Sequence, residues 1–496
     1  MKNDVNKPLA RVATGRRLGR SLPGKRLVIA AAASVALAGC ASTAIDQNYS
    51  SVQQLSQQRL GTEVKWLTTD EARRQAQADV DAMLAKPLTA DDAVRIALAY
   101  SPSLQAMLYE SAANSAAATQ SARLPNPVFA FERLLRNQGE VRDLELTRTL
   151  SFSVLDLLLL PSRLRLADYR QQANRLSLAS NVVQAATDTR QAWVSAVAAQ
   201  QSLQFVRQVK ATADASSELA RRMQAVGNYS KLQRAREQAF AADAVAQSAR
   251  AAQAAHSSRE ALIRALGLNE QQAVGLKLPE RLPDLPAQPK DEAMVANAAM
   301  DQRLDVRMAR ANLDFVAQEQ GLTRVTSIVN GLDVGITHKS ETGLAPKRGY
   351  GLSVPLPIFD FGDATRARAE ATYMTAFNRT AQLAVDANSQ VRESYGAYRT
   401  AYDIARHYRD EIVPLRKTIA EENILRYNGM LIGVFELLAD AREQITSVVL
   451  AIDAQRDFWL SDAALQANLI GKPMASMSMA NGSGANSATG ASAAGH

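Results

Sequence analysis

The chain has 496 residues, of which 47% are hydrophobic and only 5% aromatic, and its formal net charge is +8. A single Cys excludes an intrachain disulfide framework and a cysteine-rich metal site, and four scattered histidines leave little for metal binding or acid–base catalysis. Residues 1–39 hold eight basic side chains and one acidic side chain, so residues 40–496 carry a net charge of only +1. The basic pI therefore gives no reason to expect a nucleic-acid partner.

The N-terminus has the pattern of an export signal. After the basic stretch, twelve residues (27–38) are apolar apart from one serine, which is too short for a membrane-spanning helix but matches a signal-peptide core. Leu37-Ala38-Gly39-Cys40 resembles a bacterial lipobox, which implies cleavage after residue 39 and lipidation of Cys40. Ala41, where an Asp would favour inner-membrane retention, implies delivery to the outer membrane. The alternative is an ordinary secretory signal with an incidental Cys.

The mature chain is predicted to contain one pattern twice. Residues 40–89 are expected to form an N-terminal anchor and linker segment, followed by a first repeat (90–267), a proline-rich linker (268–290) and a second repeat (291–472). The matching segments are 92–93 with 292–293, 153–154 with 353–354, and Ala-Arg-Glu-Gln at 235–238 and 441–444. Their shared order and nearly constant offset of 200 to 206 residues indicate a tandem duplication.

Each repeat is expected to open with a helix of about 35 residues and, after a strand-like region, to end in two long helices separated by a turn. The predicted helices are 90–124, 163–226 and 230–266 in the first repeat, and 291–326, 363–427 and 433–470 in the second. Proline is absent between Pro161 and Pro279, and only Pro414 lies between Pro357 and Pro473. A 64-residue helix would be about 96 Å long, which exceeds a compact domain.

One of these helices carries a seven-residue apolar repeat. Its members are Val391, Tyr398, Ala405, Ile412 and Ile419. This spacing is typical of a buried seam between supercoiled helices. A ligand-stacking surface of tyrosines is the alternative, and the spacing favours core packing.

Between the helices, the sequence alternates with the period of a β-strand. Apolar and polar residues alternate over 143–154, with Arg148 as the exception, and again over 332–337 and 350–358; the partner segment 128–136 is less regular. Such strands suit a transmembrane β-barrel, apolar outside and polar inside. Two hairpins supply only four strands, and the smallest usual barrel has about eight, so a barrel would require an oligomer. Soluble hairpins that cover a core are the alternative.

Short motifs in this order resemble the TolC-type outer-membrane efflux proteins over nearly all of the mature chain. They are LTADDAV at 88–94, SPSL at 101–104, LPNP at 124–127, SVPLPIFD at 353–360 and RYNG at 426–429. The resemblance implies a mainly α fold with a β-barrel part, in a homotrimer whose protomers each give four strands to one barrel. It implies coiled helices forming a trimeric α-barrel, docked to a periplasmic adaptor and an inner-membrane pump. Such a duct is no enzyme and needs no cofactor.

The family's acidic pore constriction maps onto residues 435–442. Glu436 falls on one family acid, whereas Ala439 stands where a second is often found, with Asp440 beside it. Glu436 and Asp440 are four residues apart and share a helix face. An ordinary solvated face is the alternative to a gate that attracts cations.

The corresponding tip of the first repeat is basic. Its residues are Arg221, Arg222, Lys231, Arg234 and Arg236. We expect some of them, Arg234 and Arg236 among them, to pair with Glu421, Glu422, Glu436 or Asp440 and hold the entrance closed.

The last residues, 473–496, are rich in Ala, Ser, Gly and Asn and are expected to form a disordered tail. Met474, Met477 and Met479 could offer thioether ligands to Cu(I), although incidental low complexity explains them as well. Cargo stays open: drugs, copper or silver ions, solvents or polypeptides. The rival function is a lipid-anchored periplasmic coiled-coil adaptor or scaffold without a pore.

Overall fold

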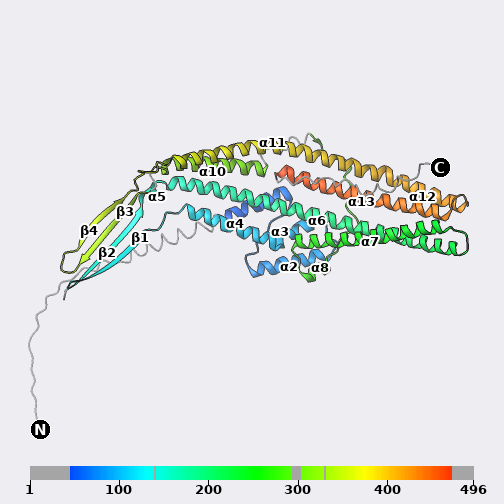
Figure 1. Ribbon diagram of the computed structural model, residues 1–496, viewed down its shortest axis with the longest axis horizontal. Coiled ribbons are helices and arrows are strands. Elements are labelled where there is room, and N and C mark those ends of the chain that lie inside the picture. The colour runs from blue at the N-terminus through cyan, green and yellow to red at the C-terminus, as the bar shows by residue number, and fades with distance from the viewer. Residues whose placement is uncertain (1–44, 139–140, 293–302, 329–330, 472–496) are drawn as a thin grey trace, which may run out of the picture.

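The computed structural model describes residues 45–138, 141–292, 303–328 and 331–471. The molecule is elongated. A β-sheet forms one end, and long helices run from it to the other end, where two tight turns connect them in pairs (Figure 1). Cys40 and the methionine-rich tail lie outside the described residues.

Two similar series of elements follow one another. The first contains α3 (Ala90–Tyr100), α4 (Pro102–Ser121), β1 (Val128–Gln138), β2 (Val141–Ser153), α5 (Val154–Leu158), α6 (Leu160–Ala225) and α7 (Lys231–Leu266). The second contains α10 (Leu304–Thr326), β3 (Asp333–Glu341), β4 (Lys347–Ser353), α11 (Asp363–His407), η2 (Tyr408–Ile412), α12 (Val413–Asn428) and α13 (Val434–Ile470). The long helices predicted at 163–226, 230–266 and 433–470 are confirmed within a few residues.

The helix predicted over 90–124 is wrong as a single element. The chain breaks at Ser101, whose φ and ψ of −54° and 126° are not helical, and α4 begins at Pro102. Proline lacks a backbone N–H and fits the first turn of a new helix better than the interior of an old one. Residues 293–302 of the matching helix predicted at 291–326 lie outside the described residues.

The helix predicted over 363–427 contains Pro414, and the structure accommodates this residue with a local change of helix type. Residues 408–412 form a π-helical turn, η2, and Pro414 lies in the first turn of α12 that follows. A wider turn accommodates a residue that cannot donate to the preceding turn. The path therefore continues to Asn428, but as three segments.

The two hairpins join in one antiparallel sheet of order β1-β2-β3-β4. Leu150 of β2 lies opposite Ile336 of β3, so the two halves of the chain meet at the centre of the sheet. The strand predicted to run to residue 358 is too long, because β4 ends at Ser353. Pro355 and Pro357 follow, and neither can donate a ladder hydrogen bond.

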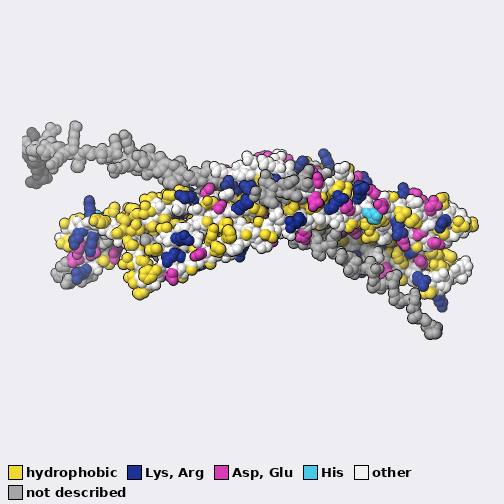
Figure 2. All heavy atoms as spheres, turned by 90° about the horizontal axis from the view of Figure 1, so that it is seen from above, with side chains coloured by type: hydrophobic (Ala, Val, Ile, Leu, Met, Phe, Trp, Pro, Cys, Tyr) yellow, Lys and Arg dark blue, Asp and Glu magenta, His cyan; other side chains and the backbone are white. Residues whose placement is uncertain are grey.

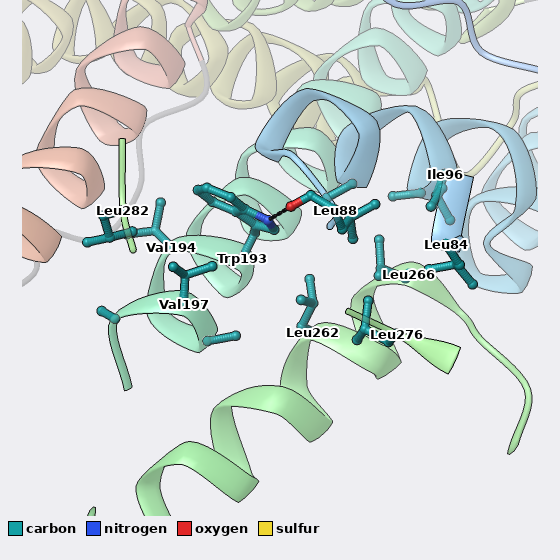
Figure 3. Close-up of a cluster of buried hydrophobic side chains, with 14 of the residues drawn as sticks. Leu84, Leu88, Ile96, Trp193, Val194, Val197, Leu262, Leu266, Leu276 and Leu282 are labelled. Atoms are coloured by element: carbon teal, nitrogen blue, oxygen red, sulfur yellow. Dashed lines mark hydrogen bonds between the residues drawn. The ribbon is translucent and has the colours of Figure 1, made fainter. Parts of the chain in front are cut away.

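The main core lies in the middle of the molecule, where α2 (Asp70–Leu84), α3, α6 and α7 meet (Figure 3). Trp193 of α6 is buried there, and its Nε1 donates to the carbonyl oxygen of Leu88 over 2.8 Å. Leu262 and Leu266 of α7 pack in the same cluster. None of the helices in the described ranges combines the length and the apolar character needed to cross a membrane.

The predicted linker 268–290 is ordered and packs closely. It contains the short helix α8 (Glu270–Gly275) and then crosses α11 and α13. The Tyr402 hydroxyl donates to the carbonyls of Pro286 and Ala287, both over 3.1 Å, and Trp459 Nε1 donates to the carbonyl of Pro283 over 3.0 Å. Tyr398 of the seven-residue repeat and Tyr402 one turn further along are fully buried against Phe458, which confirms core packing in this part of the repeat.

Candidate functional site: the helical tip and the sheet

Two tight turns form the end of the molecule opposite the sheet (Figure 1). Residues 226–230 join α6 to α7, and residues 429–433 join α12 to α13. Gly227 adopts a φ of 84° in the first turn, and Met430 adopts 59° in the second. Ser230 caps the start of α7 through reciprocal hydrogen bonds with Gln233. At each of the two turns the chain reverses its direction within five residues.

The two turns are related by the 206-residue offset more extensively than the Ala-Arg-Glu-Gln match alone indicates. Gly227 corresponds to Gly433, Tyr229 to Phe435 and Leu232 to Leu438. Tyr229 and Phe435 stack on each other, with ring centroids 4.4 Å apart and ring planes inclined by 17°. Equivalent residues of the two halves therefore meet at the tip.

A second contact joins the hairpins about two helical turns farther from the tip than the aromatic pair. Arg442 lies with its Nη1 3.7 Å from a carboxylate oxygen of Glu237 and its guanidinium carbon 4.0 Å from the ring centre of Phe240. The Glu237 carboxylate also accepts from the Ser216 hydroxyl over 2.5 Å. Only 18% of the Arg442 side chain and 13% of the Glu237 side chain are exposed, so little water screens this pair.

The contacts of Tyr229, Phe435, Glu237 and Arg442 were not predicted. The repeated Ala-Arg-Glu-Gln motif was the available signal, but a repeat shows only that two segments are equivalent. Which arginine reaches which glutamate depends on how the hairpins coil around each other.

The structure places the four predicted gate residues near the tip but does not pair them within the chain. Glu436 is exposed in the first turn of α13, and Asp440 accepts a hydrogen bond from Asn423. Arg234 donates to Gln224 over 2.8 Å, while its Nε is buried without a partner among the described residues. Arg236 is exposed.

Two of the other basic residues at the tip, Arg221 and Arg222, find partners on their own helix. Arg221 and Arg222 both donate to Glu218, over 2.8 Å and 2.7 Å, and these bonds lower the pKa of the Glu218 carboxyl to about 2. Glu421 lies 3.8 Å from Lys417. Within one chain, the expected pairing between the basic and acidic tips is therefore not formed among the described residues.

One pair of equivalent positions in the two tips nevertheless carries opposite charges, and a second pair differs by one charge. Arg234 corresponds to Asp440 by the same offset, and Ser230 corresponds to Glu436. Both charged residues of the first pair are half-buried. The two halves therefore differ in charge at the start of α7 and α13.

At the opposite end, the sheet separates its side chains by chemistry. One face carries rows of apolar residues from neighbouring strands, such as Phe129, Leu150, Ile336 and Tyr350. The other carries mainly small and polar ones, such as Ser151, Gly335 and Gly351, whose row also includes Val128. Leu352 is 65% exposed and Tyr350 90% exposed, and hydrophobic side chains gather over this end of the molecule (Figure 2).

Within the described ranges, no three His, Cys, Asp or Glu side chains come close enough together to hold a metal ion.

No family model matches the sequence, and no match to a curated protein was found. Solved structures do resemble it in fold. The outer-membrane channel OprN has a TM-score of 0.62 at 18% identity, with 80% of this chain and 91% of that chain covered. The Campylobacter jejuni CmeC outer membrane channel has a TM-score of 0.62 at 15% identity, over 80% and 86%. The open state of the Neisseria gonorrhoeae MtrE outer membrane channel has 0.62 at 18%, over 77% and 88%. The chain therefore has the fold of the TolC-type outer-membrane efflux channels.

Proposed function

We propose that this protein is the outer-membrane exit duct of a tripartite efflux system and conducts its cargo passively. The observation that carries the proposal is the sheet, which carries its apolar rows on one face and mainly small and polar residues on the other, and which has four strands in the described part of the chain. A sheet with such faces is suited to a barrel wall between lipid and a water-filled pore. Four strands are too few to close a barrel, so a homotrimer is the assembly we propose.

The helices supply the second part of the duct. α6 has 66 residues and is therefore about 99 Å long. α13 packs against α6, which places the two helical hairpins side by side in one curved wall. In the proposed trimer, three such walls enclose a tunnel through the periplasm.

The tip is the proposed contact with a periplasmic adaptor and, through it, an inner-membrane pump. Val226, Met430 and Leu431 are 72%, 93% and 77% exposed in the two turns. Exposed apolar side chains at the end of a long helical hairpin suit a docking partner.

Lipidation of Cys40 is the anchor that we propose for the N-terminus. Mass spectrometry of the mature N-terminus tests it.

We also propose that the tip forms a gate. In a ring of three chains the hairpins alternate between the two halves, so Arg234 and Asp440 would alternate around the opening. Each arginine would then have an aspartate of an adjacent hairpin on either side. Glu436, exposed one helical turn before Asp440, would contribute negative charge that favours cations in the pore.

The channel is tested by single-channel conductance of the purified full-length protein in planar bilayers of phosphatidylcholine. We expect discrete, cation-preferring steps, and a lower cation preference in Glu436→Gln/Asp440→Asn. The matched control, Asp70→Asn/Glu71→Gln, removes two exposed acids from α2 and should leave selectivity unchanged. Absence of any conductance from correctly assembled protein would favour the poreless scaffold, whereas unchanged selectivity would reject only the gate.

A further inference from the structure

The sheet contains a row of basic residues on its apolar face. Arg148 of β2 lies opposite His338 of β3, and His338 lies opposite Arg348 of β4. Residues directly opposite in an antiparallel sheet point to the same face with their Cβ atoms about 5 Å apart. Three neighbouring strands therefore present three basic side chains in one line, which we call the cationic row.

The face that carries the row is the one expected to meet lipid. Toward the helices, the next row is Phe129, Leu150, Ile336 and Tyr350, and the one after it contains Phe152, Val334 and Leu352. Toward the hairpin turns the face becomes mixed, with Arg133, Leu146 and Ser340 in one row. The cationic row lies where the continuous apolar surface ends.

Charge is divided between the two faces. All five acidic residues of the four strands occupy register positions of the opposite face: Glu132, Asp143, Glu145, Asp333 and Glu341. On that face Lys339 pairs with Glu145 over 2.5 Å. Arg148 and Arg348 are exposed, and neither forms an ion pair with another described residue.

Unpaired arginines on a lipid-facing barrel surface are costly near the bilayer midplane, by about 2–4 kcal/mol each, and much less so near the interface. An anionic headgroup removes this cost, because guanidinium groups bind phosphate through paired hydrogen bonds. The basic side chains of the cationic row would thus lie at the depth of the lipid phosphates.

The direction of the helices identifies the leaflet. In the proposed duct the helices extend into the periplasm, so the hairpin turns face outward and the cationic row lies on the outer side of the apolar rows. We propose that the cationic row binds the phosphate groups of lipopolysaccharide, the phosphorylated glycolipid of the outer leaflet. This inference rests on the proposed function. In a trimer the row would recur three times around the barrel and fasten it to the surrounding leaflet.

The test measures lipopolysaccharide retained by the purified full-length protein, and its affinity for vesicles that contain lipopolysaccharide, dephosphorylated lipopolysaccharide or phosphatidylglycerol. Arg148→Gln/Arg348→Gln should weaken binding to lipopolysaccharide by about fivefold for each arginine removed. The matched control is Lys339→Gln/Lys347→Gln, which removes two charges from the adjacent row of the opposite face and should retain wild-type binding. Dephosphorylation should weaken wild-type binding and have little effect on the arginine variant.

Equal binding by the arginine variant and wild type would overturn the proposal, as would a loss of equal size in the lysine control. Stronger binding to phosphatidylglycerol than to lipopolysaccharide would also overturn it, because the row would then recognise an ordinary phospholipid. Conductance in phosphatidylcholine bilayers, measured on the same samples, separates the two hypotheses. An arginine variant that still conducts but no longer binds lipopolysaccharide supports the proposed role of the cationic row. A wild-type protein without conductance rejects the proposed function as an exit duct.

Discussion

At the scale of single residues, one glycine makes room for the proline that begins α4. Gly267 ends α7 with a φ of 70°, and a Cβ at this position would lie 2.4 Å from Cδ of Pro102. The left-handed conformation and the close approach to a rigid proline ring both require the absence of a side chain. Thus the end of α7 and the start of α4 are fitted to each other.

We expect Gly267→Ala to lower the free energy of unfolding by about 2–4 kcal/mol, since it combines backbone strain with a clash. The control is Gly227→Ala at the tip, where φ is 84° but no atom lies within 4 Å of the added Cβ. That variant should lose only about 1–2 kcal/mol. Urea unfolding followed by tryptophan fluorescence measures both, and equal losses would show that the contact with Pro102 contributes nothing.

Asp453 of α13 gives a pH dependence of defined sign. Burial raises the pKa of its carboxyl, Arg456 at 2.7 Å opposes the shift, and Asp457 adds to it. A folded-state pKa above the unfolded value means that the folded chain binds the proton more tightly. The free energy of unfolding should therefore rise as pH falls through this raised pKa, and level off below the ordinary value near 3.8.

Asp453→Asn should remove this part of the pH dependence and stabilise the protein at pH 7. The gain should stay below about 1 kcal/mol, because 38% of the side chain is exposed and solvent screens its charge. Asp410→Asn is the contrasting variant: Arg409 lowers the pKa of Asp410, so its charged form stabilises the fold above the ordinary pKa. Melting temperatures of both variants are measured at pH 5 and pH 7. At pH 7 the melting temperature should rise for Asp453→Asn and fall for Asp410→Asn, each relative to wild type.

At the scale of the elements, the sequence predicts the long helices and the strands well, because proline positions and apolar spacing are local signals. It misses the break between Ser101 and Pro102. The apolar spacing continues across this pair, so the pattern alone does not show that one helix ends and another begins. It overextends β4, because alternation continues through Pro355 and Pro357 although pairing does not. The pairing of Arg442 with Glu237 could not be predicted, because it depends on the supercoil of two hairpins about 200 residues apart in sequence.

The contact between hairpins within a chain predicts a contact between chains. Applying the 206-residue offset to Glu237 and Arg442 gives Glu443 and Arg236, which is exposed in this structure. In a closed ring, we expect Arg236 of one chain to lie near Glu443 of the next. Glu443 already contacts Arg416 of α12 over 2.6 Å and is 60% exposed, which leaves room for a second cation.

Arg236→Cys/Glu443→Cys should therefore yield a disulfide-linked trimer under mild oxidation, visible by non-reducing electrophoresis. Arg236→Cys alone and Glu443→Cys alone are the controls and should remain unlinked or form at most dimers. If the double variant gives no linked trimer while the wild type is trimeric in solution, the two tips are not related in the ring as they are within the chain.

At the scale of the whole molecule, the open edges of the sheet are the main reason to expect an assembly. β1 and β4 are the outer strands of a four-stranded sheet and each has one unpaired side. Unpaired strand edges and an exposed apolar face together favour association with further strands. In the proposed assembly, strands of other chains would pair with the free edges of β1 and β4.

Hydrogen exchange on the full-length protein in detergent tests this closure. In a closed barrel, backbone amides of β1 and β4 should exchange as slowly as those of the inner strands β2 and β3. Mass spectrometry after digestion resolves these segments. Fast exchange confined to β1 and β4 would mean that the edges stay open and no barrel is formed.

The opposite charges at Arg234 and Asp440 have a consequence for how such a ring evolves. Six identical hairpins would place the same charge at all six positions, and neighbours would repel one another. Fusing two hairpins into one chain lets each half diverge, so that a ring with threefold symmetry gains complementary neighbours. A substitution in one half then alters three positions instead of six, and the opening can be tuned in finer steps.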